Sequence, residues 1–115
     1  INIFMDELRF EKKENFITVL LNTKNEIISK EIISIGNLNT SIVHPREVYK
    51  LAIKKSASSI IFIHNHPSGD PKPSQNDKNI TNRLVKVGDL IEIDVIDHII
   101  LGNNKYFSFK ENNLI

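Results

Sequence analysis

One short segment constrains the fold of this chain more than any other. An apolar run over residues 60–63 leads directly into His64-Asn65-His66, and residues 67–73 then contain three prolines and one glycine. Such a run, bounded by turn residues, predicts a central strand that ends in a loop. Because residues i and i+2 of a strand share a face, the two imidazoles can point in the same direction.

The segments around this strand alternate between strand and helix patterns. Runs rich in β-formers predict further strands over residues 16–21, 26–35, 91–101 and 106–109, the first two as a hairpin. Helices are expected to begin at Pro45 and at Ser74, the second ending near Gly88. Residues 1–13 suit a short helix or an arm. The sequence therefore predicts an α/β (α+β) fold in which helices pack on a mixed sheet.

Composition narrows the class of protein. A chain of 115 residues with 40% hydrophobic and 25% charged content is typical of one soluble globular domain. A net charge of +1 gives no electrostatic reason to expect nucleic acid or a membrane as a partner. With no cysteine, a bound metal must use nitrogen and oxygen ligands. No apolar run reaches the ~18 residues of a membrane span, and no signal peptide is recognisable, so we expect a cytoplasmic protein.

Asp77 completes a set of metal-ligand types. It lies at the start of the second expected helix, from which its carboxylate can return to His64 and His66. Two imidazoles and one carboxylate with an open fourth position is how a catalytic zinc ion is held. A purely structural interpretation stays open, because Ser74 and Asp77 also match the Ser-x-x-Asp pattern of a helix capping box. Ser74 can therefore cap the helix or face a metal-bound water.

A zinc-bound water also needs a base to take its proton. Two carboxylates are candidates: Glu14, at the entrance to the first strand, and Glu47, in the first turn of the first helix. Each has a structural alternative, since acids favour helix N-termini and Glu14 belongs to a charged run that suits solvent. The residues alone leave the choice between them open.

Taken together, these residues resemble the JAMM motif of the MPN (JAB1) metalloprotease fold. That motif is an upstream glutamate, then His-x-His-Pro, then Ser-x-x-Asp. More narrowly, the chain resembles the RadC family, named as DNA repair proteins, over essentially its whole length. The matching blocks are Val43-His44-Pro45-Arg46-Glu47-Val48, residues 64–69, Pro73-Ser74 and Asp97-His98.

The resemblance implies roles for individual residues. His64, His66 and Asp77 would bind Zn²⁺, and Ser74 would hydrogen-bond the metal's water or the developing oxyanion. The family's glutamate stands at the start of the first long strand, which favours Glu14 over Glu47 as the general base. His98 has no place in the motif and is interpreted as a structural histidine beside Asp97.

The resemblance also implies the architecture and the function. The expected fold is a curved mixed sheet flanked by helices in a three-layer, cytidine-deaminase-like arrangement. Residues 1–115 would form a single MPN (JAMM) domain, a fragment without the family's N-terminal helix-hairpin-helix segment. The expected function is zinc-dependent hydrolysis of a peptide or isopeptide-like bond in an unidentified protein or peptide. The alternatives are a DNA-binding or nuclease factor and an interaction module with structural zinc, and a homodimer is compatible with each.

Overall fold

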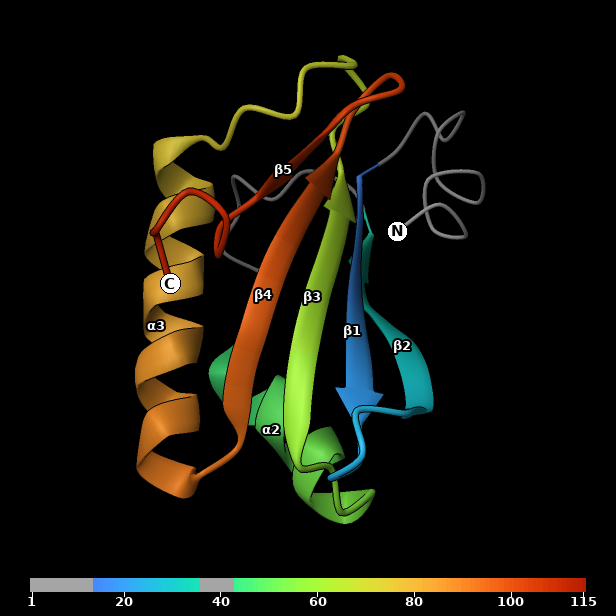
Figure 1. Ribbon diagram of the computed structural model, residues 1–115, viewed down its shortest axis with the longest axis vertical. Coiled ribbons are helices and arrows are strands. Elements are labelled where there is room, and N and C mark those ends of the chain that lie inside the picture. Colours follow the sequence, from blue (N-terminus) through green and yellow to red (C-terminus); the bar gives the residue numbers. More distant parts are fainter. Residues whose placement is uncertain (1–13, 36–42) are drawn as a thin grey trace.

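The computed structural model of the protein describes residues 14–35 and 43–115. These residues form a five-stranded mixed sheet and two helices, which confirms the expected fold class (Figure 1). Residues 1–13, expected to form a short helix or an arm, lie outside the described residues. The elements are β1 (Asn15–Leu21), β2 (Ile27–Ile35), α2 (Pro45–Lys54), β3 (Ser59–Asn65), α3 (Gln75–Ile91), β4 (Asp94–Leu101) and β5 (Tyr106–Ser108).

The strand order places β3 in the middle of the sheet. The order is β2-β1-β3-β4-β5, and β3 pairs antiparallel with β1 but parallel with β4. A parallel pair needs a crossover connection, which α3 provides. The carboxyl ends of β3 and β4 therefore lie at the same edge of the sheet, where the loop to α3 also begins (Figure 1). In sheets with parallel strands, this edge is the usual place for a ligand site.

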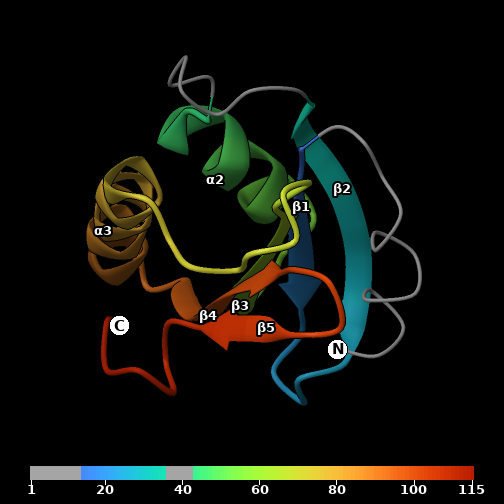
Figure 2. The ribbon, with the colours of Figure 1, turned by 90° about the horizontal axis from the view of Figure 1, so that it is seen from above.

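The two faces of the sheet carry separate apolar clusters. One cluster combines alternate residues of β1, such as Phe16 and Leu20, with residues of both helices, such as Val48 and Leu84. The second is built from β1, β3 and β4 and contains no helix residue. Figure 2 shows α2 and α3 on the same side of the sheet. The described residues thus supply two of the three expected layers.

The end of α3 differs from the expectation. The helix continues through Gly88 to Ile91, and Glu92 adopts the left-handed conformation that ends it, with φ 61°. Gly88 instead meets a packing requirement, because an added Cβ would lie 2.5 Å from the Ile93 carbonyl oxygen and 2.6 Å from the Tyr49 hydroxyl. The expected stop at Gly88 was wrong because tertiary packing, and not chain termination, requires glycine there.

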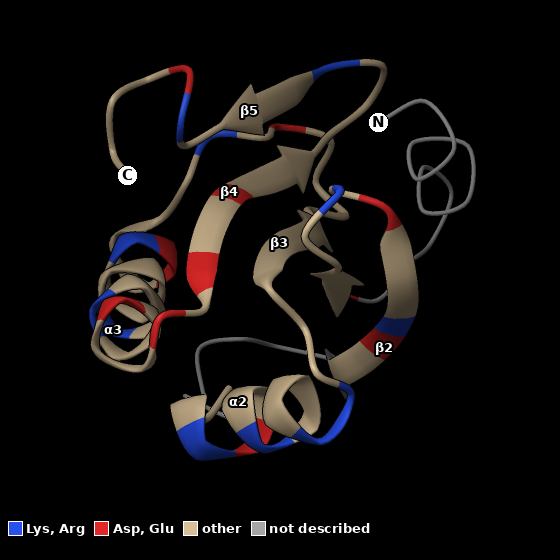
Figure 3. Ribbon diagram, turned by 60° about the horizontal axis from the view of Figure 1, so that its bottom comes forward, with Lys and Arg blue, Asp and Glu red and all other residues tan. Residues whose placement is uncertain are grey.

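Two further findings bear on possible partners. Among residues 14–35 and 43–115, no helix has the length and apolar character needed to cross a membrane. The helix α2 carries three basic residues and one acid, α3 carries three basic residues and two acids, and β3 carries no charged residue (Figure 3).

Candidate metal centre

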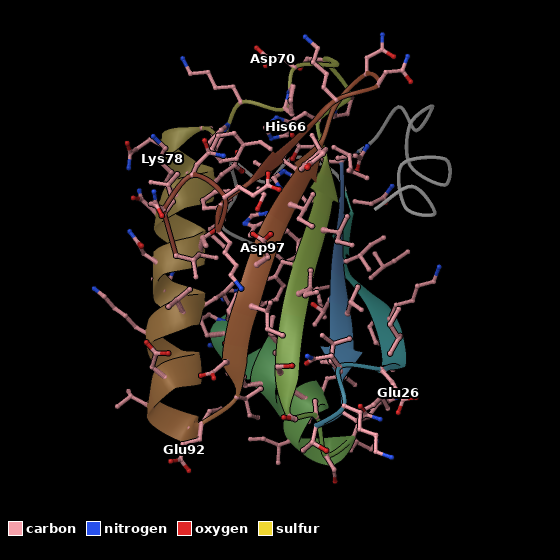
Figure 4. The ribbon with its side chains drawn as sticks, in the orientation of Figure 1. Glu26, His66, Asp70, Lys78, Glu92 and Asp97 are labelled. Atoms are coloured by element: carbon pink, nitrogen blue, oxygen red, sulfur yellow. The ribbon has the colours of Figure 1, made fainter. Side chains whose placement is uncertain are left out.

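The paired histidines lie at the carboxyl end of the central strand. His64 is within β3, opposite Phe16 of β1 and Ile100 of β4. His66 follows the strand, and its backbone N–H donates to the Leu101 carbonyl at 2.9 Å. Pairing on both sides therefore fixes the backbone from which the two imidazoles project. Figure 4 shows His66 at this end of β3, close to the loop that carries Asp70.

The loop after His66 is folded against the turn between β4 and β5. Gly69 has φ 90°, a conformation that other residues rarely adopt. Its N–H donates to the His66 carbonyl at 3.0 Å, and its own carbonyl accepts from Asn103 N–H at 2.8 Å. Gly102 packs so closely on this loop that an added Cβ would lie 2.7 Å from Pro71 Cδ. The loop is thereby directed back over the site toward α3.

The carboxylate of Asp77 combines the two roles that its sequence pattern left open. Its Oδ2 accepts from the Ser74 backbone N–H at 2.7 Å, while Ser74 Oγ accepts from Asp77 N–H at 3.0 Å, which completes a capping box. The same Oδ2 lies 3.2 Å from His66 Nε2, and Oδ1 lies 3.7 Å from His64 Nε2. Capping therefore holds the carboxylate where it faces both imidazoles.

Glu14 reaches the same place from the start of β1. Ligand atoms of Glu14, His64 and His66 all lie within 4.8 Å of one another, so these three residues can hold a metal ion. The backbone beside Glu14 is fixed, because Asn15 N–H donates to the buried Asn65 Oδ1 at 2.7 Å. Glu47 does not belong to this group; it is exposed on α2 and lines a surface groove with Lys50 and Lys54.

One buried atom in the site lacks a hydrogen-bond partner. His64 is 0% exposed, and its Nε2 makes no hydrogen bond. Buried polar atoms are nearly always paired, because an unpaired one costs about 1–3 kcal/mol. This nitrogen faces the carboxylate of Asp77 and belongs to the potential metal-ligand group. A donor set of imidazole nitrogen and carboxylate oxygen suits zinc and neighbouring divalent metals.

Electrostatics favour the protonation states that bind metal at two of these residues. Burial lowers the pKa of His64 to about 4, although the charge of Asp77 opposes the shift. The pKa of Asp77 is lowered despite its burial, because His66, His64 and the Ser74 backbone stabilise its charge. Burial also acts against a charged His66, but its bonds to Asp77 and Asp70 raise its pKa overall. At neutral pH, His64 is neutral and Asp77 ionised, as metal ligands must be.

His98 is the buried structural residue beside Asp97 that the sequence predicted, and it also contacts the site. It is structural in that it is 1% exposed, and its backbone N–H does donate to Asp97 at 2.7 Å. Its imidazole, however, lies against the site, with Nε2 3.0 Å from His64 Nδ1 and Nδ1 2.6 Å from Thr81 Oγ1. Sequence reasoning also missed Thr81, although its position four residues after Asp77 places it on the same face of the helix. His98 itself could be placed only from the β3–β4 register, which pairs it with Phe62.

Comparisons with known proteins show which proteins this chain is similar to. A family model described as the RadC-like JAB domain matches residues 1–114. A UPF0758 protein of Clostridioides difficile is 63% identical over 112 residues, which are 97% of this chain and 48% of that protein. One of Alkaliphilus metalliredigens is 59% identical over 99% of this chain and 49% of its own length. The chain therefore spans about half the length of these relatives.

Proposed function

The chain belongs to the RadC-like JAB domain family, and from this membership we propose that it is a zinc-dependent hydrolase of metallopeptidase type. The bond cleaved is a peptide or isopeptide-like amide. One observation carries the proposal: Glu14, His66 and Asp77 converge on the buried Nε2 of His64, which has no hydrogen-bond partner. His64, His66 and Asp77 would hold the ion, and the rest of the site would act on the substrate.

The metal ion and Glu14 would have different roles in the reaction. When bound, zinc would supply a Lewis acid for the scissile carbonyl and lower the pKa of its water. Glu14, which is partly exposed beside the two histidines, accepts the proton of the attacking water and passes it to the leaving amine nitrogen. Glu14 is held for this by the bond between Asn15 N–H and Asn65.

Ser74 would assist at the carbonyl oxygen. In the capping box its Oγ accepts a hydrogen from Asp77 N–H, so the cap does not use the hydroxyl hydrogen. That hydrogen remains available to the negative charge that develops on the substrate oxygen. Removal of one such donor in other hydrolases costs about 3 kcal/mol of transition-state stabilisation.

The test compares two glutamates with the same chemistry and different positions. Glu14→Gln should retain zinc and lose about 10²–10⁴-fold in peptide hydrolysis, whereas Glu47→Gln should behave like wild type. Zinc content is measured by elemental analysis, and cleavage is measured on peptide and DNA substrates in parallel. Full activity of Glu14→Gln would exclude Glu14 as the base, and loss of its zinc would make it a ligand instead. Cleavage of DNA without cleavage of any peptide would favour the nuclease alternative.

A further inference from the structure

We propose that Thr81 and His98 form a hydrogen-bond relay that sets the tautomer of His64, so that His64 Nε2 presents a lone pair to the metal. His98 and Thr81 would thus be positioning residues: they do not bind the metal, and they act through His64, which does. The proposal deepens the proposed function, because it concerns the same site and rests on His64 being a ligand there.

The relay begins at the backbone carbonyl of Asp77, which can only accept hydrogen bonds. Thr81 Oγ1 donates to the Asp77 backbone carbonyl at 2.8 Å, and this bond uses the single hydrogen of the hydroxyl. The same Oγ1 lies 2.6 Å from His98 Nδ1. Since the hydroxyl has no second hydrogen to give, His98 Nδ1 must carry the hydrogen of that bond.

The tautomer of the first ring then determines that of the second. A neutral imidazole has one N–H and one lone pair, so His98 Nε2 is an acceptor when Nδ1 is protonated. His98 Nε2 lies 3.0 Å from His64 Nδ1, which must therefore donate. The remaining nitrogen of His64, Nε2, is left with its lone pair directed at the site.

Burial keeps both rings neutral, as this argument requires. His64 and His98 are 0% and 1% exposed. Phe109 stacks on His98 with ring centroids 4.6 Å apart and planes at 6°, and Phe16 packs edge-on at 5.5 Å. A positive charge on either of these buried rings would be strongly unfavourable. Each ring is therefore restricted to a choice between its two neutral tautomers.

The reverse direction of the relay is disfavoured. It would require Thr81 to give up its bond to the Asp77 carbonyl, and it would place the hydrogen of His64 on Nε2. That N–H would have no hydrogen-bond partner, since His64 Nε2 has none and Asp77 Oδ1 lies 3.7 Å from it. A buried donor without an acceptor is costly. The forward direction instead leaves a lone pair, which a bound cation satisfies.

The relay also joins two of the expected ligands through one turn of α3. It starts at the backbone carbonyl of Asp77, passes through Thr81 and His98, and ends at His64. Partners of this kind typically contribute 10–100-fold to metal affinity by fixing the orientation and tautomer of the ligand. We therefore expect a similar loss when the relay is interrupted.

Two matched pairs of variants test the proposal. His98→Phe preserves an aromatic ring among its aromatic neighbours and removes the acceptor, whereas His98→Gln keeps an acceptor oxygen near the position of Nε2. Thr81→Val removes the hydroxyl and keeps the shape, whereas Thr81→Ser keeps the hydroxyl. Competition with a chromophoric chelator should show Zn²⁺ affinity reduced about 10–100-fold in the Phe and Val variants. The Gln and Ser variants should recover most of it.

The tautomer can be read directly in the metal-free wild-type protein. Long-range ¹H–¹⁵N spectra of the imidazole rings should show both His64 and His98 with hydrogen on Nδ1. Hydrogen on His64 Nε2, or Zn²⁺ affinity unchanged in both Thr81→Val and His98→Phe, would overturn the relay. If a variant does not fold, the wild-type spectrum still decides. If the wild type binds no Zn²⁺ yet shows the expected tautomers, the relay is supported and the proposed hydrolase fails.

Discussion

The two roles of the Asp77 carboxylate can be separated by one substitution. In the wild type, Asp77 Oδ2 accepts from the Ser74 N–H at 2.7 Å. Asp77→Asn keeps an oxygen that can accept this bond but removes the negative charge that faces His64 and His66. In the metal-free protein the change should cost about 1 kcal/mol, since a charge near a helix N-terminus contributes about 0.3–1 kcal/mol. For a domain of this size, that lowers the melting temperature by about 4 °C.

The effect on the metal should be much larger. Loss of a partner that only orients a ligand reduces metal affinity about 10–100-fold, and loss of a charged ligand should exceed that range. The assay is Zn²⁺ affinity by chelator competition, with thermal unfolding in EDTA measured on the same samples. We expect more than about 100-fold weaker Zn²⁺ binding and a small change in melting temperature.

Ser74→Ala is the matched control for this prediction. It removes the hydroxyl that accepts from Asp77 N–H at 3.0 Å and should cost about 1 kcal/mol, as loss of a helix cap usually does. It leaves the carboxylate in place, so Zn²⁺ affinity should change little. Wild-type Zn²⁺ affinity in Asp77→Asn would reduce Asp77 to a helix cap. Equal loss in both variants would show that distortion of the helix start, and not loss of a ligand, weakens binding.

The remaining predictions concern pH and packing. Folding lowers the pKa of His64 from 6.5 to about 4, so between these pH values the unfolded chain binds more protons than the folded protein. The free energy of unfolding of the metal-free protein should therefore decrease as the pH is lowered from 6.5 to about 4. Asp77, whose pKa is also lowered, adds to this loss at lower pH, whereas the raised pKa of His66 opposes it. Urea unfolding across this range measures the slope, which should be shallower in His64→Asn; a flat profile in wild type would contradict the reasoning. Gly88→Ala should destabilise the fold by about 1–3 kcal/mol, because its Cβ would approach the Tyr49 hydroxyl to 2.6 Å, and an unchanged melting temperature would refute it.

Local patterns in the sequence predicted those parts of the site that are close together along the chain. The apolar run before His64 forms β3, the proline-rich stretch forms the loop, and Ser74 and Asp77 form the expected capping box. These features depend on backbone preferences and on bonds between residues three or four positions apart. Such preferences act regardless of how the remainder of the chain packs.

The other features of the site and fold depend on contacts between segments that are far apart in the sequence. The residues alone left Glu14 and Glu47 both open, and the family resemblance favoured Glu14. The pairing of β1 with β3 is what brings the start of β1 to the two imidazoles. The role of His98 depends on the β3–β4 register, and the need for Gly88 depends on the approach of α2 to α3. No local pattern encodes these contacts, because each joins segments whose separation in sequence is unrelated to their distance in space.

The sequence by itself therefore determined which groups are available: two imidazoles at the end of a strand and a carboxylate on a capped helix. The tertiary structure decided how they are used. It buried His64 among aromatic side chains, left its Nε2 without a hydrogen-bond partner, and placed Glu14 beside it and His98 behind it. The physical reason is that ligand geometry, desolvation and tautomer all depend on neighbours in space, which strand order, register and the packing of α3 supply.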